Sequence, residues 1–203
     1  MKLLVRPPRL LRSYYKHSVW RMNKDEPVIY LTFDDGPIEE LTPWVLDVLK
    51  QYNVKATFFC VGNNIDKNNH IFSRLLNEGH RVGNHTYNHI KGWKTKTKEY
   101  LENVEQCEQL TKTKLFRPPY GRIKKKQFLK LIPYYKIVFW DVLTHDYDPL
   151  LSPAKCLSNS IKYTRNGSVV VFHDNMKAQK NLKFVLPQYI EHFLKLNYKF
   201  AVL

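Results

Sequence analysis

Short apolar segments alternate with longer amphipathic segments along most of the chain. Residues 28–33 (VIYLTF) and 56–61 (ATFFCV) are rich in β-branched and aromatic side chains, which predicts buried strands. Residues 42–52 place Val45, Leu46 and Leu49 on one side behind a proline in the first turn, which predicts an amphipathic helix. The same alternation predicts strands at residues 80–84, 115–117, 137–142, 168–172 and 199–203, and helices at residues 69–78, 96–111, 124–131, 152–163 and 182–196.

This order of elements predicts an α/β fold. Strands with few charges, each followed by a helix, indicate a parallel sheet covered by helices. About seven such units can form an open sheet or a small, irregular (β/α) barrel. No internal repeat or linker interrupts the pattern. We therefore expect one domain over residues 27–203, preceded by a basic N-terminal segment over residues 1–26.

Composition narrows the class of protein. With 203 residues, 43% of them hydrophobic, the chain can bury a sizeable core. Lys and Arg outnumber Asp and Glu by 33 to 18, a net charge of +15 that favours an anionic partner such as nucleic acid, a phospholipid surface or an acidic glycan. A basic surface that only maintains solubility is the alternative. The three cysteines form no CxxC pair, which argues against a disulfide framework and favours a reducing compartment.

The N-terminal segment shows neither an export signal nor a membrane span. In residues 1–21 the apolar runs are interrupted by Arg, Lys and a Pro pair. A secretory signal needs roughly 7–15 uninterrupted apolar residues, and a span needs about 20. We therefore expect a cytoplasmic protein. The basic, aromatic-bearing segment either packs across the domain, which we favour, or lies on an anionic membrane surface as in a peripheral membrane protein.

Ionisable residues follow five of the predicted strands. In βα barrels the loops after the strands build the active site, so these groups should meet at one rim. They are Asp34 and Asp35, His85, Arg117, the stretch from Asp141 to Asp146, and His173.

Two of these motifs suggest a metal site. Of two adjacent carboxylates, Asp34 and Asp35, one can bind a cation while the other serves as a base, although a DDG stretch alone is typical of a turn. His85 and His89 are spaced to share one face of a helical turn. Two imidazoles and one carboxylate form a three-ligand set typical of catalytic zinc. Non-haem iron oxygenases use the same set, so the ligands alone leave the reaction open.

The remaining motifs suggest roles around such a metal. Arg117 can make a bidentate contact with a carboxylate, and the prolines after it hold a turn whose backbone N–H can face an oxyanion. A rigid surface turn is the alternative. His173 emerges from an apolar strand, where histidine is normally structural. Paired with a buried carboxylate such as Asp146, it would stay protonated and act as an acid.

Five motifs in order, TFDDGP, HTYNH, RPPYG, WDVLTHDY and FHD, resemble those of the polysaccharide deacetylases, the NodB-homology enzymes of carbohydrate esterase family four. The resemblance runs from about residue 28 to the C-terminus, and only the ordered set is specific. It implies a distorted (β/α) barrel, usually of seven strands. It also implies metal-dependent hydrolysis of the N-acetyl group of a sugar, with release of acetate.

Matched by position, the resemblance assigns roles to individual residues. Asp35, His85 and His89 would bind a divalent metal, typically Zn²⁺, with Co²⁺, Ni²⁺ or Mn²⁺ as alternatives. Asp34 would be the general base and Arg117 would hold it. The backbone N–H of Tyr120 would stabilise the oxyanion, His173 would be the general acid, and Asp146 would tune it. We expect substrate contacts at Pro119, Tyr120, Trp140 and Tyr147.

The sequence departs from the family pattern at two positions. Tyr147 stands where the family often has Trp, and Val171 stands where Leu is common. Both positions shape the acetyl pocket in the family, so the departures bear on substrate fit and leave the chemistry intact.

Single features of the chain are compatible with three other functions. The acetylated sugar could be lipid-linked and processed at the cytoplasmic membrane. The chain could be a non-catalytic carbohydrate-binding relic of the fold, which would be expected to lose a ligand or the base first. Nucleic-acid binding rests only on charge, because no reader motif is present, and is disfavoured.

Overall fold

The computed structural model describes residues 4–203, and its centre is one parallel sheet. From edge to edge the strands are β5 (Lys136–Ile137), β4 (Leu115–Phe116), β3 (Arg81–Asn84), β2 (Thr57–Cys60), β1 (Val28–Asp34), β7 (Val169–His173) and β6 (Val142–Leu143). In register, Thr32 of β1 lies beside Thr57 of β2 and Val171 of β7. A further strand, β8 (Lys199–Phe200), pairs in parallel with the start of β1.

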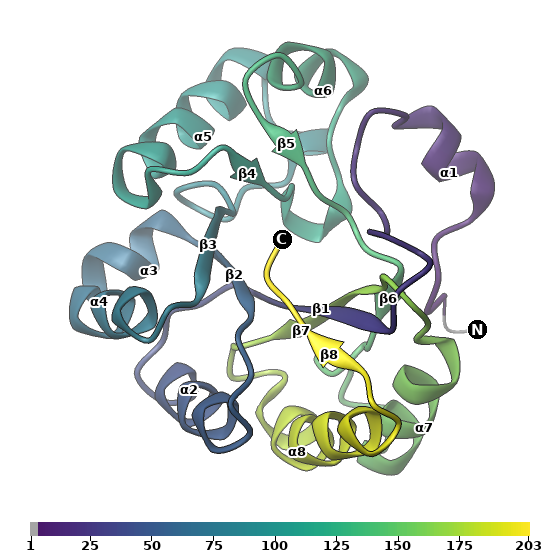
Figure 1. Cartoon of the computed structure of the whole chain (residues 1–203). Coiled ribbons are helices and arrows are strands. Elements are labelled where there is room, and N and C mark those ends of the chain that lie inside the picture. Colours follow the sequence, from purple (N-terminus) through teal and green to yellow (C-terminus); the bar gives the residue numbers. More distant parts are fainter. Residues whose placement is uncertain (1–3) are drawn as a thin grey trace.

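Helices surround this sheet. Figure 1 shows the strands curling inside a ring of helices, with α1 beside the ring near the N-terminus. The helices are α1 (Arg9–Tyr14), α2 (Thr42–Gln51), α3 (Gly62–Lys67), α4 (Asn69–Asn77), α5 (Thr97–Thr111), α6 (Lys125–Leu131), α7 (Pro153–Tyr163) and α8 (Gln179–Lys195), with short 3₁₀ turns η1 (Gly92–Lys94) and η2 (Pro119–Gly121). The predicted α/β fold, a distorted barrel of about seven parallel strands, is confirmed.

Both faces of the central strands are buried, which explains why β1 and β7 are almost continuously apolar. Ile29, Leu31 and Phe33 of β1 belong to the large core beneath the outer helices. A smaller apolar cluster includes Phe59 of β2 and Leu203 at the C-terminus. The C-terminus ends in the middle of the ring in Figure 1, and the Leu203 N–H donates to Thr57 Oγ1 at 3.1 Å. The last residues of the chain therefore pack against the inside of the curled sheet.

The prediction of a single strand at residues 137–142 is wrong. These residues are divided between β5 and β6, and a residue of the N-terminal segment pairs with the stretch between them. Val19 donates to the carbonyl of Ile137 at 2.8 Å and accepts from Phe139 at 2.7 Å. The N-terminal segment thus fills the opening that two short edge strands leave. Helices α1 and α3 are not predicted, α8 begins at Gln179 instead of residue 182, and the final strand covers only Lys199–Phe200.

The described part of the N-terminal segment packs on the domain. The rings of Tyr15 and Trp20 stack on Phe139, with centroids 5.3 and 4.3 Å away. Arg12 donates to the buried Asp141 at 2.8 Å. Residues 1–3 of the predicted segment 1–26 lie outside the described residues. From residue 4 onward, no helix combines the length and apolarity that crossing a bilayer requires.

Candidate metal centre and catalytic cleft

The carboxyl ends of the strands open into a cleft of about 720 Å³. Nine of the side chains singled out from the sequence line it: Asp34, Asp35, His85, His89, Tyr120, Trp140, Tyr147, Val171 and His173. Arg117 and Asp146 are fully buried behind its wall. Pro119 is also buried, and it is not among the residues that line the cleft.

Three side chains converge as metal ligands would. The Nε2 atoms of His85 and His89 lie 3.6 and 3.0 Å from Asp35 Oδ1, and one ligand atom from each residue lies within 4.8 Å of the others. His85 Nδ1 is 2.8 Å from the carbonyl oxygen of Arg117. A carbonyl can only accept, so this nitrogen carries the proton and the lone pair of Nε2 faces Asp35.

The protonation states agree with this donor set. Burial lowers the pKa of His85 to about 4, so its imidazole is neutral at neutral pH. Burial alone would raise the pKa of Asp35. The hydrogen bond from His89 and the positive charge of nearby His173 outweigh burial and hold that pKa well below its usual range. One ionised carboxylate and two imidazoles form a set that fits Zn²⁺.

The two imidazoles do not share a helical turn, which corrects the sequence-based expectation. Residues 85–89 form a loop after β3, with φ of 65° at Thr86 and 53° at His89. This left-handed backbone brings the two rings to a centroid distance of 5.1 Å. Asp35 also has a positive φ, 89°. Such conformations cost energy and tend to cluster at functional sites, where the surrounding structure holds them.

Two asparagines that sequence reasoning missed hold Asp35. Asn175 Nδ2 donates to Asp35 Oδ2, and Asn64 Nδ2 donates to the Asp35 carbonyl at 2.7 Å. The first bond leaves Oδ1 as the oxygen that faces the imidazoles. The one available signal was position, because Asn175 lies two residues beyond His173, after the same strand.

Asp34 is held by Arg117 from within the fold. Arg117 Nη1 donates to Asp34 Oδ1 at 2.6 Å and to Thr32 Oγ1 at 2.7 Å. Its Nη2 donates to the carbonyl of Phe139 at 3.0 Å. The expected bidentate contact between Arg117 and a carboxylate is therefore wrong, because Nε and Nη2 donate to backbone carbonyls instead. Asp34 keeps its second oxygen without an arginine bond.

His173 and Asp146 form a close pair at the end of β7. His173 Nδ1 lies 2.7 Å from Asp146 Oδ1, and the His173 backbone N–H donates to Oδ2 at 2.8 Å. Burial lowers the pKa of His173. The charge of Asp146 and its hydrogen bond, with Asp35 and Asp34 beyond, outweigh burial and raise the pKa to about 9. His173 is thus protonated at neutral pH.

The turn after β4 carries a free backbone donor. Tyr120 has a φ of 60°, and its N–H finds no acceptor among residues 4–203. A Cβ on the next residue, Gly121, would come within 2.4 Å of the Trp140 ring, so only glycine allows this close packing. The Tyr120 ring lies 4.6 Å from the ring of His89, centroid to centroid.

Asp141 does not join the rim, which corrects the expectation that the whole stretch from Asp141 to Asp146 would do so. It precedes β6 and accepts hydrogen bonds from Arg12, Arg165 and Ser168, the last at the amino end of β7. Asp146 follows β6 and reaches the cleft wall. Division of the predicted strand places the two carboxylates at opposite ends of the sheet.

The curled parallel sheet and the groups at its carboxyl ends together define a NodB-like α/β fold. The family model described as polysaccharide deacetylase matches residues 21–134, more than half of the chain. The protein belongs to this family.

Named relatives agree. The chain is 40% identical over 158 residues to a peptidoglycan-N-acetylglucosamine deacetylase of Bacillus cereus, a match covering 74% of this chain and 56% of that protein. A second Bacillus cereus protein of that name is 32% identical over 193 residues, which are 91% of this chain and 90% of the relative. The solved structure of the Bc1960 peptidoglycan N-acetylglucosamine deacetylase, in complex with 4-naphthalen-1-yl-N-oxidanyl-benzamide, superposes with a TM-score of 0.89. It is 32% identical and covers 97% of this chain and 95% of that one. The chain thus spans about half of the first relative and nearly all of the second.

Proposed function

We propose that the protein hydrolyses the N-acetyl group of an N-acetylated sugar and releases acetate, with a divalent metal as cofactor. The observation that carries the proposal is the convergence of Asp35, His85 and His89 beside a second carboxylate, Asp34. The names of the relatives suggest the N-acetylglucosamine units of peptidoglycan as the substrate.

Asp35, His85 and His89 would hold the metal, with Zn²⁺ as the first candidate and Co²⁺, Ni²⁺ or Mn²⁺ as alternatives. When bound, the cation supplies Lewis acidity that polarises the acetyl carbonyl and makes water more acidic. Asn175 and Asn64 orient Asp35 for this task.

Asp34 acts as the general base. Arg117 fixes its Oδ1, and the second oxygen takes the proton from the attacking water. Attack on the carbonyl produces a tetrahedral oxyanion. The free N–H of Tyr120 is the chain's own donor to that oxygen, and loss of one such donor typically costs about 10²–10³ in rate.

His173 acts as the general acid. Asp146 occupies Nδ1 and keeps the imidazole protonated, so Nε2 can give its proton to the departing amine nitrogen. An amine is a poor leaving group until it is protonated. Breakdown of the tetrahedral species therefore depends on this pair.

The acetyl methyl group fits between three side chains that line the cleft, Leu143, Tyr147 and Val171. The Tyr147 ring stands edge-on to that of His173, with centroids 4.8 Å apart. Tyr147, one of the two positions that depart from the family pattern, thus lies beside the proposed acid. Trp140 and Tyr120 provide aromatic surface for the sugar.

Acetate release tests the proposal. Metal-free protein reconstituted with each of the four ions is assayed against N-acetylglucosamine oligomers, peptidoglycan strands and lipid-linked N-acetylated sugars. Release from the first two supports the proposal, whereas release from the lipid-linked sugar alone supports the membrane-associated alternative. Tight metal binding with no release from any substrate would favour the non-catalytic relic and overturn the proposal.

A further inference from the structure

Three basic side chains line the cleft outside the proposed catalytic centre: Lys91, Arg122 and Lys177. No ion pair among residues 4–203 includes any of them. Elsewhere, several arginines at buried or half-buried positions are paired with carboxylates: Arg12 and Arg165 with Asp141, and Arg117 with Asp34. The cleft therefore presents cations that the protein itself does not neutralise.

Among the described residues that line the cleft, no carboxylate is available to neutralise these three cations. Among its described lining residues the only carboxylates are Asp34 and Asp35. The first is bonded to Arg117, and the second faces two imidazoles. Charges of one sign in a cleft with low-dielectric walls focus the field and attract ligands of the opposite sign.

The three cations flank the reacting centre on two sides. Lys91 and Arg122 follow β3 and β4, whereas Lys177 follows β7. Strand β1, which delivers Asp34, lies between them in the sheet order. A ligand that crosses the centre therefore meets positive charge on both sides, as successive units of an extended chain would.

Two of the cations lie on aromatic faces suited to sugars. Lys91 Nζ is 4.5 Å from the centroid of the Tyr120 ring, and the Arg122 guanidinium carbon is 5.1 Å from that of Trp93. Both rings remain open to solvent, Tyr120 at 50% and Trp93 at 56% exposure. Aromatic rings provide stacking surface for the apolar face of a sugar. A cation beside such a ring is placed to meet an acidic substituent of the same or the next sugar.

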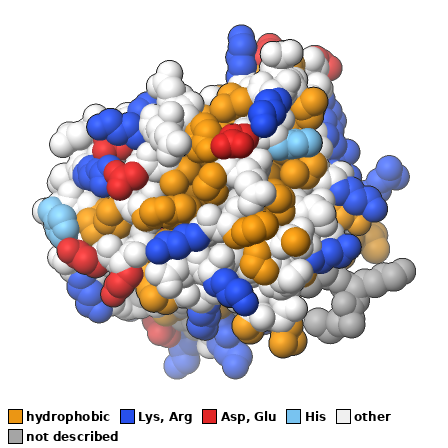
Figure 2. Space-filling model, turned by 90° about the horizontal axis from the view of Figure 1, so that it is seen from below, with side chains coloured by type: hydrophobic (Ala, Val, Ile, Leu, Met, Phe, Trp, Pro, Cys, Tyr) orange, Lys and Arg blue, Asp and Glu red, His pale blue; other side chains and the backbone are white. Residues whose placement is uncertain are grey.

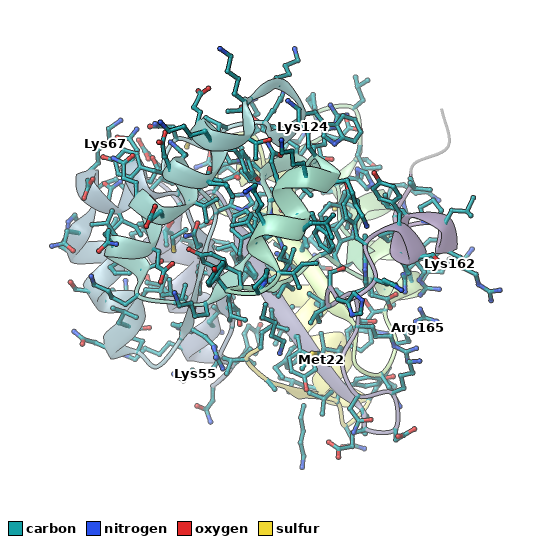
Figure 3. All side chains as sticks on the ribbon, turned by 90° about the horizontal axis from the view of Figure 1, so that it is seen from above. Met22, Lys55, Lys67, Lys124, Lys162 and Arg165 are labelled. Carbon is teal, nitrogen blue, oxygen red and sulfur yellow. The ribbon has the colours of Figure 1, made fainter. Side chains whose placement is uncertain are left out.

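Net charge alone would not single out this cleft. Figure 2 shows Lys and Arg side chains on the lower face of the molecule as well, interspersed there with Asp, Glu and apolar side chains. Figure 3 shows Lys124 and Lys67 toward one end of the barrel and Lys55 at the opposite end. What distinguishes the cleft is that its three cations, which lack carboxylate partners, border the proposed catalytic centre.

We propose that Lys91, Arg122 and Lys177 bind carboxylate groups of the glycan on either side of the reacting sugar, so that the enzyme selects an acidic N-acetylated chain over a neutral one. This inference rests on the proposed deacetylation and adds the charge of the substrate to it. The matching ligand is a chain in which sugars next to the reacting N-acetylglucosamine carry a carboxylate, as an ether-linked lactyl group does.

A matched pair of substrates tests the inference. Peptide-free oligomers of alternating N-acetylglucosamine and N-acetylmuramic acid are prepared with the lactyl carboxyl either free or methyl-esterified. For the unmodified enzyme we expect kcat/KM for the free acid to exceed that for the ester by about 10-fold at low salt, and the ratio to fall with added salt. In the triple variant Lys91→Gln/Arg122→Gln/Lys177→Gln the ratio should fall to about 1.

The control removes the same charge elsewhere. Lys55→Gln/Arg81→Gln/Lys162→Gln also deletes three cations, none of which lines the cleft, and Lys162 lies over the Tyr163 ring as Lys91 lies over Tyr120. This variant should keep the acid-to-ester ratio of the unmodified enzyme. If it loses the ratio as fully as the cleft variant does, general charge explains the preference and the inference is wrong.

Equilibrium binding separates this inference from the proposed function. Dissociation constants are measured for the deacetylated oligomers in both forms, a measurement that needs no turnover. Tighter binding of the acid form by unmodified protein, lost in the cleft variant, supports the inference even where no acetate is released. Equal binding and equal kcat/KM for acid and ester overturn it, while acetate release from both would leave the proposed deacetylation intact.

Discussion

Arg117 and Asp34 meet at 2.6 Å although their strands, β4 and β1, are separated in the sheet by β3 and β2. The arginine reaches across the inside of the curled sheet, with its guanidinium carbon 4.0 Å from the centroid of the Phe59 ring. Both side chains are buried. The carboxylate proposed as the base is thus oriented from the interior of the fold, which leaves its other oxygen to the cleft.

Replacement of Asp34 by Asn should remove activity and keep the metal. The amide cannot accept the proton from water, so we expect kcat to fall by about 10²–10⁴-fold. Elemental analysis should show unchanged metal content, because Asp34 is not one of the three converging ligands. Substantial remaining turnover would remove Asp34 from the role of base.

Replacement of Arg117 by Met should destabilise the fold. It leaves Asp34 buried without its charge partner, a change that typically costs about 3–5 kcal/mol in the free energy of unfolding. The double variant Asp34→Asn/Arg117→Met should lose less than the sum of the single variants. Chemical denaturation of all four proteins measures this coupling, and strict additivity would contradict it.

Replacement of His89 by Ala should abolish tight metal binding. The His89 Nε2 atom is 3.0 Å from Asp35 Oδ1, within the group of three candidate ligands. The substitution removes this nitrogen and leaves only Asp35 and His85 as ligands. We expect the loss in affinity to exceed the roughly 10–100-fold typical of losing a partner outside the ligand set. Titration calorimetry provides the measurement, with His70→Ala as the control because His70 does not belong to the cluster. Unchanged affinity would exclude His89 as a ligand.

Replacement of Asn175 by Ala should weaken metal binding by about 10–100-fold, since Asp35 loses the donor that orients it. Asn175 also accepts from the Ala178 N–H near the start of α8, so some stability should be lost as well. Ser152→Ala is the matched control, because it removes the cap of α7 without contact to the cluster. Equal metal affinities in both variants would show that Asn175 has a structural role alone.

The pair of His173 and Asp146 should set the alkaline limit of activity. The pKa of His173 is raised to about 9, so the acid form is complete near neutral pH and is lost as the pH rises through that value. The stability that the pair contributes follows the same sign: it is fully present below the unfolded pKa of about 6.5 and disappears as the pH approaches 9. Asp146→Asn should lower the pKa of His173 and move the alkaline limb of kcat to lower pH. An unmoved limb would contradict the proposed role of Asp146.

Local patterns predicted most of the framework. The buried strands β1, β2 and β7 are almost continuously apolar, and helices α2, α4 and α8 carry apolar stripes, so these elements could be expected from the sequence. Prediction failed where an element depends on a distant segment. The stretch at residues 137–142 has the composition of one strand, yet Val19 pairs beside it and it divides into β5 and β6.

The order of residues along the chain already specifies which reactive groups are present: carboxylates, imidazoles and one arginine, each placed after a segment able to form a strand. Parallel strands deliver such residues to a common edge, so a shared site could be expected. Which of these groups meet at that edge depends on how the chain folds in three dimensions. Asp146 lies behind the cleft wall and bonds to His173, while Asp141 lies at the other end of the sheet. Asn175 touches Asp35, and three unpaired cations border the centre. These outcomes depend on strand order and on loop backbones with positive φ, which residue type and spacing along the chain do not specify.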